Sequence, residues 1–221
     1  MRLSRLPLFL FTLNLFLAAQ TTVKKAPAPA APPPQPPAAI QASSPDSLDR
    51  DFVSGGYIRM QLSAGTYRIS ASADGKIHVK WSINSSEILK RVKVSADVNG
   101  TQATIRTDAP DNEHFRVDIQ VPSHSDLLVR FTAGDFQIDG IEGNKDVAGY
   151  AGNLSIDVGD VGLYKEVHAS VTTGDLNARP FHVSKGGLWR SFDRRGGGIY
   201  ILRVKLLAGD LKLYARERDS A

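Results

Sequence analysis

Apolar and polar residues alternate along most of the chain after residue 52, which is the pattern of β-strands that bury one face. The run FRVDIQV, residues 115–121, shows it most clearly, with four apolar side chains on one face before Pro122 ends it. No segment after residue 50 keeps a helical period over three turns; SSEILKRVKV, residues 85–94, comes nearest. The pattern predicts an all-β domain over residues 52–221.

A short phrase recurs within this alternation. It consists of alternate small or apolar residues, then glycine, then aspartate or a substitute, then two more alternate apolar residues. An early copy is centred on Gly65, and the intervals between the four later glycines are 18, 22 and 35 residues. The four later corners are Gly134-Asp135, Gly152-Asn153, Gly174-Asp175 and Gly209-Asp210.

The chemistry of these corners predicts how each repeat folds. Glycine allows a positive φ, and aspartate or asparagine can hydrogen-bond the local backbone, so each copy is expected to be strand, tight corner, strand. No copy can bury its apolar face alone, so successive copies should stack into one narrow core. The repeats therefore predict a β-solenoid or β-helix-like domain, whose longest interval holds an extra irregular coil or a long loop.

The run FRVDIQVPSHSDLLVRFTAGDFQIDGIEGNKDV, residues 115–147, resembles bacterial putative-adhesin domains of unknown function. The matching features are Val121-Pro122, the Gly-Asp corners at 134, 174 and 209, and the segment Gly140 to Gly143. The likeness covers roughly residues 57–215 and departs from the family's pattern at residues 186–198. It implies a β-solenoid at the cell envelope or surface, and it implies no catalytic residues.

The N-terminus has the pattern of an export signal followed by a spacer. Arg2 and Arg5 precede an apolar run of about a dozen residues and then Ala18-Ala19-Gln20, so residues 1–20 are interpreted as a signal peptide. Retention of this segment as an anchor is the alternative. Residues 21–51 are rich in proline and alanine, which predicts an extended or disordered linker, either a stalk or a plain spacer. No other segment is long and apolar enough to cross a membrane as a helix.

Composition excludes several kinds of chemistry. The chain has no cysteine, so it can form neither a disulfide nor a thiolate metal site. Its net charge of +4 over 221 residues is small and does not favour nucleic acid as a partner. We therefore predict that the chain binds no nucleic acid.

One segment, GGLWRSFDRRGGG, residues 186–198, is predicted to be a loop that combines aromatic rings with arginines. That combination suits a sugar, an anionic polymer or a protein partner. The alternative is that the aromatic residues cap the end of the solenoid while the arginines are solvated. The candidate binding residues are Trp189, Arg190, Phe192, Arg194 and Arg195.

No catalytic, cofactor-binding or metal-binding residue is predicted. The five histidines have no metal-ligand spacing, and His168 is expected to point outward from its strand. The corner aspartates are spaced too widely for a calcium-binding β-roll, so they are interpreted as turn-forming. Two carboxylate pairs could serve a glycoside hydrolase only if a cleft held them at the required separation. These pairs are Asp118 with Asp126, and Asp157 with Asp160.

These observations predict an exported, non-enzymatic protein of the periplasm, envelope or cell surface, acting as an adhesive or structural binding module. Its partner would be an envelope polysaccharide or a surface protein, and no cofactor is expected. Two alternatives remain open: an envelope enzyme that acts on polysaccharide, and an accessory or sensor subunit that binds an envelope protein.

Overall fold

The computed structural model describes residues 46–110 and 114–216, and most of this part is β-strand. The predicted all-β class is therefore confirmed. One short α-helix, α1 (Ser86–Leu89), and two single 3₁₀ turns, η1 (Val161–Leu163) and η2 (Arg179–Phe181), interrupt the strands. The predicted signal peptide, and the linker up to residue 45, lie outside the described residues.

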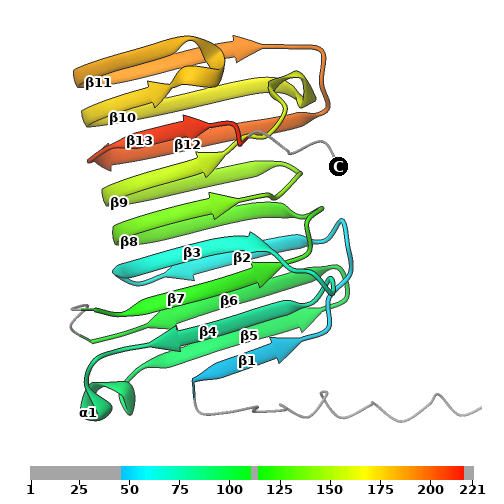
Figure 1. Cartoon of the computed structure of the whole chain (residues 1–221), viewed down its shortest axis with the longest axis vertical. Helices are drawn as coiled ribbons and strands as arrows, with labels where there is room; N and C mark the ends of the chain where they lie inside the picture. Colours follow the sequence, from blue (N-terminus) through cyan, green and yellow to red (C-terminus); the bar gives the residue numbers. More distant parts are fainter. Residues whose placement is uncertain (1–45, 111–113, 217–221) are drawn as a thin grey trace, which may run out of the picture. The chain divides into compact units, whose positions relative to one another are not determined.

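Thirteen strands pair into one continuous hydrogen-bonded network (Figure 1). In chain order they are β1 (Ser47–Arg50), β2 (Tyr57–Leu62), β3 (Gly65–Ala71), β4 (Ile77–Ser82), β5 (Lys93–Asn99), β6 (Gln102–Asp108), β7 (Arg116–Val121), β8 (Asp126–Asp139), β9 (Lys145–Asp157), β10 (Tyr164–Ala178), β11 (Val183–Arg195), β12 (Tyr200–Ala208) and β13 (Leu211–Tyr214).

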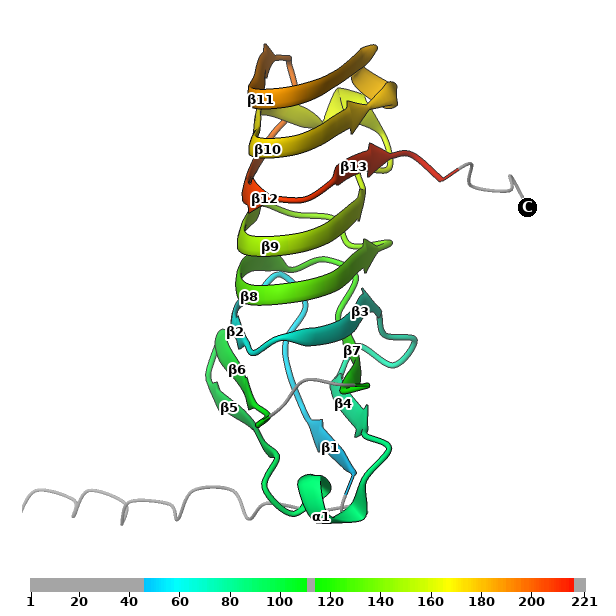
Figure 2. The same cartoon turned by 90° about the vertical axis from the view of Figure 1, so that its left-hand side faces the viewer.

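Most of the strands form bent layers that lie one above another, as Figure 2 shows. The long strands β8, β9 and β10 each bend at a glycine and so have two arms. The pairs β2 with β3, and β12 with β13, form comparable layers in two pieces, because each pair aligns with the two arms of its neighbours. The bend places the apolar faces of the two arms toward a shared interior.

The order of the layers differs from their order in the sequence. β8 pairs with β9, β9 with β12 and β13, and these with β10, so the last copy of the repeat is inserted between two earlier ones. The expectation that successive copies stack on one another is therefore wrong for the last copy. The reason is that β11 already pairs antiparallel with the outer edge of β10, so only the edge that faces β9 remains for a parallel layer.

The longest interval between repeats is mostly a strand. Residues 186–195, predicted to lie in a loop, belong to β11, and only residues 196–199 connect it to β12. Of the two predicted contents, an extra coil or a long loop, the structure therefore has an extra layer. It could not be recognised from alternation, since apolar residues are sparse along β11.

Glycine is required at the corners because neighbouring backbones touch there. Gly152 has a φ of 120°, and a Cβ at this position would lie 1.9 Å from the carbonyl oxygen of Gly134. The same construction at Gly209 places a Cβ 1.9 Å from the carbonyl oxygen of Gly152. The predicted positive φ at the corners is therefore confirmed. The corner glycines stack as a glycine column, which sets the close spacing of the layers and consists of Gly134, Gly152, Gly174 and Gly209.

The polar residues after the corner glycines act between layers. The Asn153 side-chain amide donates to Asp135 Oδ1 at 2.8 Å, and the Asp175 backbone N–H donates to Asp210 Oδ1 at 3.1 Å. The sequence predicts that these side chains bond their own local backbone, and the structure has these contacts between layers instead. The parallel stack brings the neighbouring corner within reach, and a donor of that corner bonds the carboxylate instead of the local backbone.

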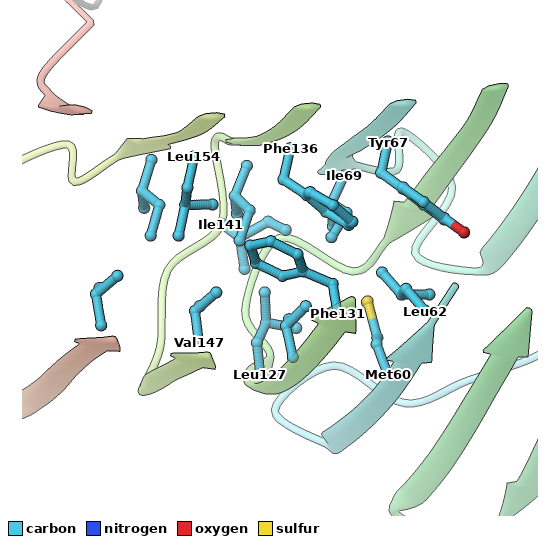
Figure 3. Packing of buried hydrophobic residues seen from close by; sticks show 14 of the residues in the cluster. Met60, Leu62, Tyr67, Ile69, Leu127, Phe131, Phe136, Ile141, Val147 and Leu154 are labelled. Carbon is cyan, nitrogen blue, oxygen red and sulfur yellow. The ribbon is translucent and has the colours of Figure 1, made fainter. Parts of the chain in front are cut away.

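Inward side chains form columns that run through the layers (Figure 3). In one column the Phe131 ring fills the space above Gly149, where a Cβ would lie 2.0 Å from the ring. The Phe131 ring stacks on Phe136 with centroids 3.8 Å apart, and Phe136 stacks on Tyr67 at 4.6 Å. The predicted alternation is confirmed by the burial of Phe115, Val117, Ile119 and Val121.

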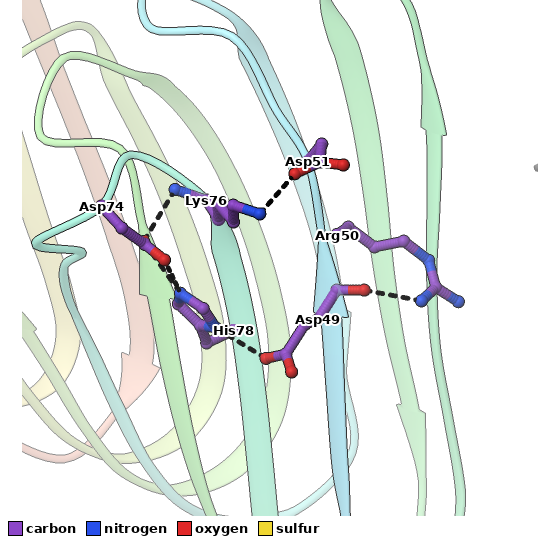
Figure 4. A network of polar contacts seen from close by, with 6 residues as sticks. All are labelled: Asp49, Arg50, Asp51, Asp74, Lys76 and His78. Atoms are coloured by element: carbon purple, nitrogen blue, oxygen red, sulfur yellow. Dashed lines mark hydrogen bonds and ion pairs between the residues drawn. The ribbon is translucent and has the colours of Figure 1, made fainter. Parts of the chain in front are cut away.

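The end of the stack near β1 is closed by contacts between the two arms. Leu48 of β1 is buried, and Arg50 Nε donates to the Ala96 carbonyl of β5 at 3.0 Å. On the outside, His78 of β4 bonds Asp49 through Nδ1 at 2.6 Å and Asp74 through Nε2 at 2.9 Å (Figure 4). β1 lies within residues 21–51, which we predicted to be linker, so the sheet begins earlier than expected because Leu48 joins the core.

Candidate functional site

The predicted binding residues lie on β11, the last strand at the end of the stack opposite β1 (Figure 1). We call β11, residues 183–195, the terminal layer. Its register with β10 decides which side chains face the core, because directly paired residues point to the same face. Phe192 pairs with Ala169, is 7% exposed, and packs on Phe181 of η2 with ring centroids 5.6 Å apart.

Three further inward positions of the terminal layer carry cations. Arg194 pairs with Val167, Arg190 with Val171 and Lys185 with Leu176. The partners on β10 are all buried in the apolar core. In every other layer of these columns the position is apolar or glycine, except Lys145 of β9. The terminal layer therefore closes the core mostly with charge, apart from Phe192 and Val183, which pairs with the buried Ala178.

These cations have only backbone and ring partners. Lys185 Nζ donates to the Ser191 carbonyl at 2.8 Å, and Arg190 Nε donates to the Gly186 carbonyl at 2.6 Å, so the two cations reach toward each other's arm across the bend. Arg194 Cζ lies 5.2 Å from the centre of the Phe181 ring. Within residues 46–110 and 114–216, no carboxylate lies within ion-pair distance of these three cations or of Arg195.

The single carboxylate of the terminal layer is already engaged. Asp193 Oδ1 lies 2.6 Å from His168 Nδ1 of β10. His168 points outward, as predicted, and it is about half exposed. The strand thus holds four cations and one carboxylate, a net charge of +3, whereas the whole chain carries +4. Positive charge is therefore concentrated at this end.

Trp189 and Leu188 lie at the outer corner of the terminal layer. Trp189 is 79% exposed and Leu188 is 60% exposed, and the indole makes no ring or cation contact with the described residues. Trp189 also has a φ of 55°, a left-handed conformation that is unusual for a bulky side chain. The aromatic cap expected at the end of the stack is therefore made by Phe192, while Trp189 faces away from the core.

A second candidate site, which sequence analysis missed, is a recess of about 510 Å³ beside the ends of β9 and β13. Its lining is mostly apolar, with Tyr164 and Tyr200 in edge contact at 6.4 Å between centroids. Glu142, Asp157 and Arg216 supply charge at its wall. The one available signal was Lys145, a charged residue at a position where the alternation of β9 calls for an apolar side chain.

Lys145 does not line this recess but contacts Tyr164 of its wall, and it is 1% exposed. Its Nζ donates to the Tyr164 hydroxyl at 3.0 Å. Burial lowers the pKa of Lys145 to about 8, while the charges of Asp157, Glu142 and Asp126 oppose that shift. Burial, with a contribution from Asp157, raises the pKa of the Tyr164 hydroxyl. Tyr164 therefore remains a neutral hydrogen-bond partner over the pH range in which Lys145 titrates.

Three of the four aspartates in the candidate carboxylate pairs accept hydrogen bonds from backbone N–H groups. Asp126 Oδ1 accepts from the Asn144 backbone N–H at 2.8 Å, Asp157 Oδ1 from the Gly159 N–H at 2.9 Å, and Asp160 Oδ1 from the Gly162 N–H at 2.8 Å. Asp118 is exposed on β7. In the part of the chain that the structure describes, no group of three or more histidine, aspartate or glutamate side chains could hold a metal ion.

The chain is similar in structure to two solved proteins that are named as adhesins. One is a putative cell adhesion protein from Clostridium sporogenes ATCC 15579, 13% identical, with a TM-score of 0.48 over 77% of this chain and 99% of that one. The other is a putative adhesin from Bacteroides fragilis NCTC 9343, also 13% identical, with a TM-score of 0.30 over 76% of this chain and 96% of that one. Both TM-scores lie below 0.5, so neither likeness assigns a fold or a function.

No family model matches the chain, and neither does any curated protein sequence. Among the described residues, no helix has the length and apolar character needed to span a membrane.

Proposed function

We propose that the chain is an exported, non-enzymatic binding module of the cell envelope or surface, with a β-solenoid-like stack that presents the terminal layer to its partner. The sequence supports export through the pattern of residues 1–20 and the proline-rich segment after it. The stack supports presentation, because the chain enters the described fold at β1 and the terminal layer lies at the other end of the strand order.

The observation that carries this proposal is the placement of Trp189. A left-handed backbone costs a non-glycine residue roughly 1–2 kcal/mol, and a tryptophan that is 79% exposed recovers little of this through packing. Exposed aromatic residues beside arginine are enriched at the centres of binding interfaces. Packing within the fold does not account for a tryptophan at this corner, whereas a partner that covers the indole would account for it.

The test is the binding of the full chain to envelope fractions of the source cells. The double substitution Leu188→Ser with Trp189→Ala should lower the amount that co-sediments by about tenfold, a loss of the size expected for a central aromatic contact. Tyr150→Ala is the matched control, because Tyr150 is an exposed aromatic residue at the corner of β9. Unchanged binding of the double variant, or an equal loss with Tyr150→Ala, would contradict the proposal.

Export is tested separately with a C-terminal tag. The tagged chain should be found in the periplasmic, envelope or extracellular fraction. Recovery of the folded, tagged chain from the cytoplasm alone would contradict the assignment of residues 1–20 as an export signal.

A further inference from the structure

We propose that the terminal layer recognises an anionic polysaccharide, an inference that rests on the proposed function and gives its ligand a chemical class. The first step is charge. Lys185, Arg190, Arg194 and Arg195 have no carboxylate partner among the described residues, and their strand holds a net charge of +3. Guanidinium and ammonium groups in this state favour carboxylate, sulfate or phosphate groups.

The arrangement of the cations favours a chain-like ligand over a single ion. Arg194 and Arg190 lie along one arm of β11, and Lys185 lies on the other arm beyond the bend. Successive inward positions of a strand are about 6 to 7 Å apart, so the row of cations extends over more than one monomer of a polymer. The exposed Trp189 corner lies between the two arms and offers a flat apolar face to a sugar ring.

The outer edge of β11 favours a sugar polymer over a lipid surface. No described strand pairs with this edge, so its backbone N–H and C=O groups require partners from outside the strand network. Sugar hydroxyls and water both donate and accept hydrogen bonds, whereas hydrocarbon does neither. Only Leu188 and Trp189 would be available for insertion into a bilayer, since the remaining exposed positions of the strand are polar, charged or glycine.

The same edge does not suit a second copy of the chain. A copy paired with β11 would continue the stack and bring a second set of Lys185, Arg190 and Arg194 into the same interior. Inward-pointing charge is a known device against pairing between sheet edges, because the buried cations would repel one another. The terminal layer thus ends the stack and leaves the charge available to an anionic ligand.

The experiment compares dextran sulfate with dextran, which share a sugar backbone and differ in charge. The purified full chain should bind dextran sulfate, with an affinity that falls as salt is raised, and should bind dextran at least about tenfold more weakly. The triple substitution Lys185→Gln, Arg190→Gln, Arg194→Gln should lower the affinity for dextran sulfate by at least about tenfold. Trp189→Ala should lower it less and leave its salt dependence unchanged.

The matched control removes the same number of charges elsewhere. Arg59, Lys93 and Arg116 are exposed cations of β2, β5 and β7 without an ion pair among the described residues. Their substitution by glutamine should change the affinity by less than about twofold. Circular dichroism and the thermal midpoint of each variant show whether it is folded, so loss of fold is not read as loss of binding.

Each other outcome overturns the inference. Equal losses in the two triple variants would mean that net charge alone attracts the polymer. Equal binding of dextran and dextran sulfate would remove the role of the anion, and tighter binding to phosphatidylglycerol vesicles than to dextran sulfate would indicate a lipid surface. Envelope binding that depends on Trp189, without binding to dextran sulfate, would preserve the proposed function and reject this ligand class. If the chain showed neither Trp189-dependent envelope binding nor binding to dextran sulfate, both proposals would be rejected.

Discussion

Two layers of the stack, β9 and β11, place cations at inward positions, and they treat this charge in opposite ways. Lys145 and Arg194 belong to the same column, whose other members include Leu127, Leu202 and Val167. Lys145 is buried, bonds the Tyr164 hydroxyl and lies within the field of three carboxylates. Arg194 is exposed and has an aromatic ring but no carboxylate beside it.

The difference shows what an inward cation can mean in a stacked β fold. In the interior, the charge must be compensated by the protein, and it then behaves as part of the core. At the end, water provides the compensation, so the charge can both stop the stacking and attract a ligand. The sequence pattern is the same in both layers; the neighbouring layers decide which role applies.

The largest expected effect comes from breaking the glycine column that holds both layers in register. Gly209→Ala places a Cβ against the carbonyl of Gly152 and imposes an unfavourable φ, so we expect it to prevent folding or to cost more than about 4 kcal/mol of unfolding free energy. Gly197→Ala is the control, since a Cβ there meets no atom within 4 Å. Denaturant unfolding measures both. A Gly209→Ala chain as stable as the parent would mean that the corners are not in close contact.

The second effect separates the two aromatic residues of the terminal layer. Phe192→Ala should cost about 3 kcal/mol of unfolding free energy, because the ring covers the apolar end of the core. Trp189→Ala should change the free energy by less than about 0.5 kcal/mol, since the indole is exposed. Denaturant unfolding of both variants measures the contrast. Similar costs for the two substitutions would place Trp189 in the cap and remove the argument that it is reserved for a partner.

The sequence predicts the local features of the layers, namely which side chains face the core and where the strands bend. Alternation and the Gly-Asp phrase predict that Phe131, Val171 and Leu206 face the core and that the corner glycines have positive φ, and both are observed. The place of the last copy could not be predicted, because it depends on which edge of β10 is still free. The strand β1 could not be predicted either, because Leu48 is its only buried apolar residue.

The candidate site was predictable in part for the same reason. The sequence singled out residues 186–198 by composition, and alternation places Phe192 and Trp189 on opposite faces. It does not show which face is inward, since arginines flank Phe192 on its own face, at positions 190 and 194. Lys145 escaped notice because one lysine in an apolar run resembles an outward position. Its role depends on Tyr164 of β10, which lies outside its column and accepts a hydrogen bond from its amine.

The third prediction compares Lys145 with Arg190, one of the inward cations of the terminal layer. Lys145→Met should raise the unfolding free energy at pH 7 by about 1–3 kcal/mol, because burial penalises the charged amine. Arg190→Met should change it by less than about 0.5 kcal/mol, since water reaches Arg190 at the end of the stack. Denaturant unfolding at matched pH measures both variants. A loss of stability in Lys145→Met would mean that Tyr164 and the carboxylates more than offset the cost of burial.

The pH dependence of the third prediction has a definite sign. The pKa of Lys145 is about 8 in the folded protein against 10.5 as the ordinary value, so the unfolded chain holds the proton more tightly between these two values. The parent protein therefore gains stability as pH rises above about 8, and the advantage of Lys145→Met should shrink over the same range. An advantage that stays constant up to pH 9.5, about the limit before tyrosines titrate, would contradict the lowered pKa.

The smallest expected effect concerns the paired charge near β1, the opposite case to the terminal layer. The Asp49 and Asp74 hydrogen bonds raise the pKa of His78 above its ordinary value of 6.5. The stabilisation is therefore fully present below pH 6.5 and is lost as pH rises through the raised pKa. His78→Gln should lower the thermal midpoint slightly at a pH of about 6 and leave it unchanged at a pH of about 9. Lys145 titrates in both proteins, so its contribution cancels in the difference. Lys80→Gln, on the outer face of the same strand, should show no such pH dependence. A His78→Gln effect that is equal at both pH values would mean that packing of the ring, and not its charge, holds β1 to β4.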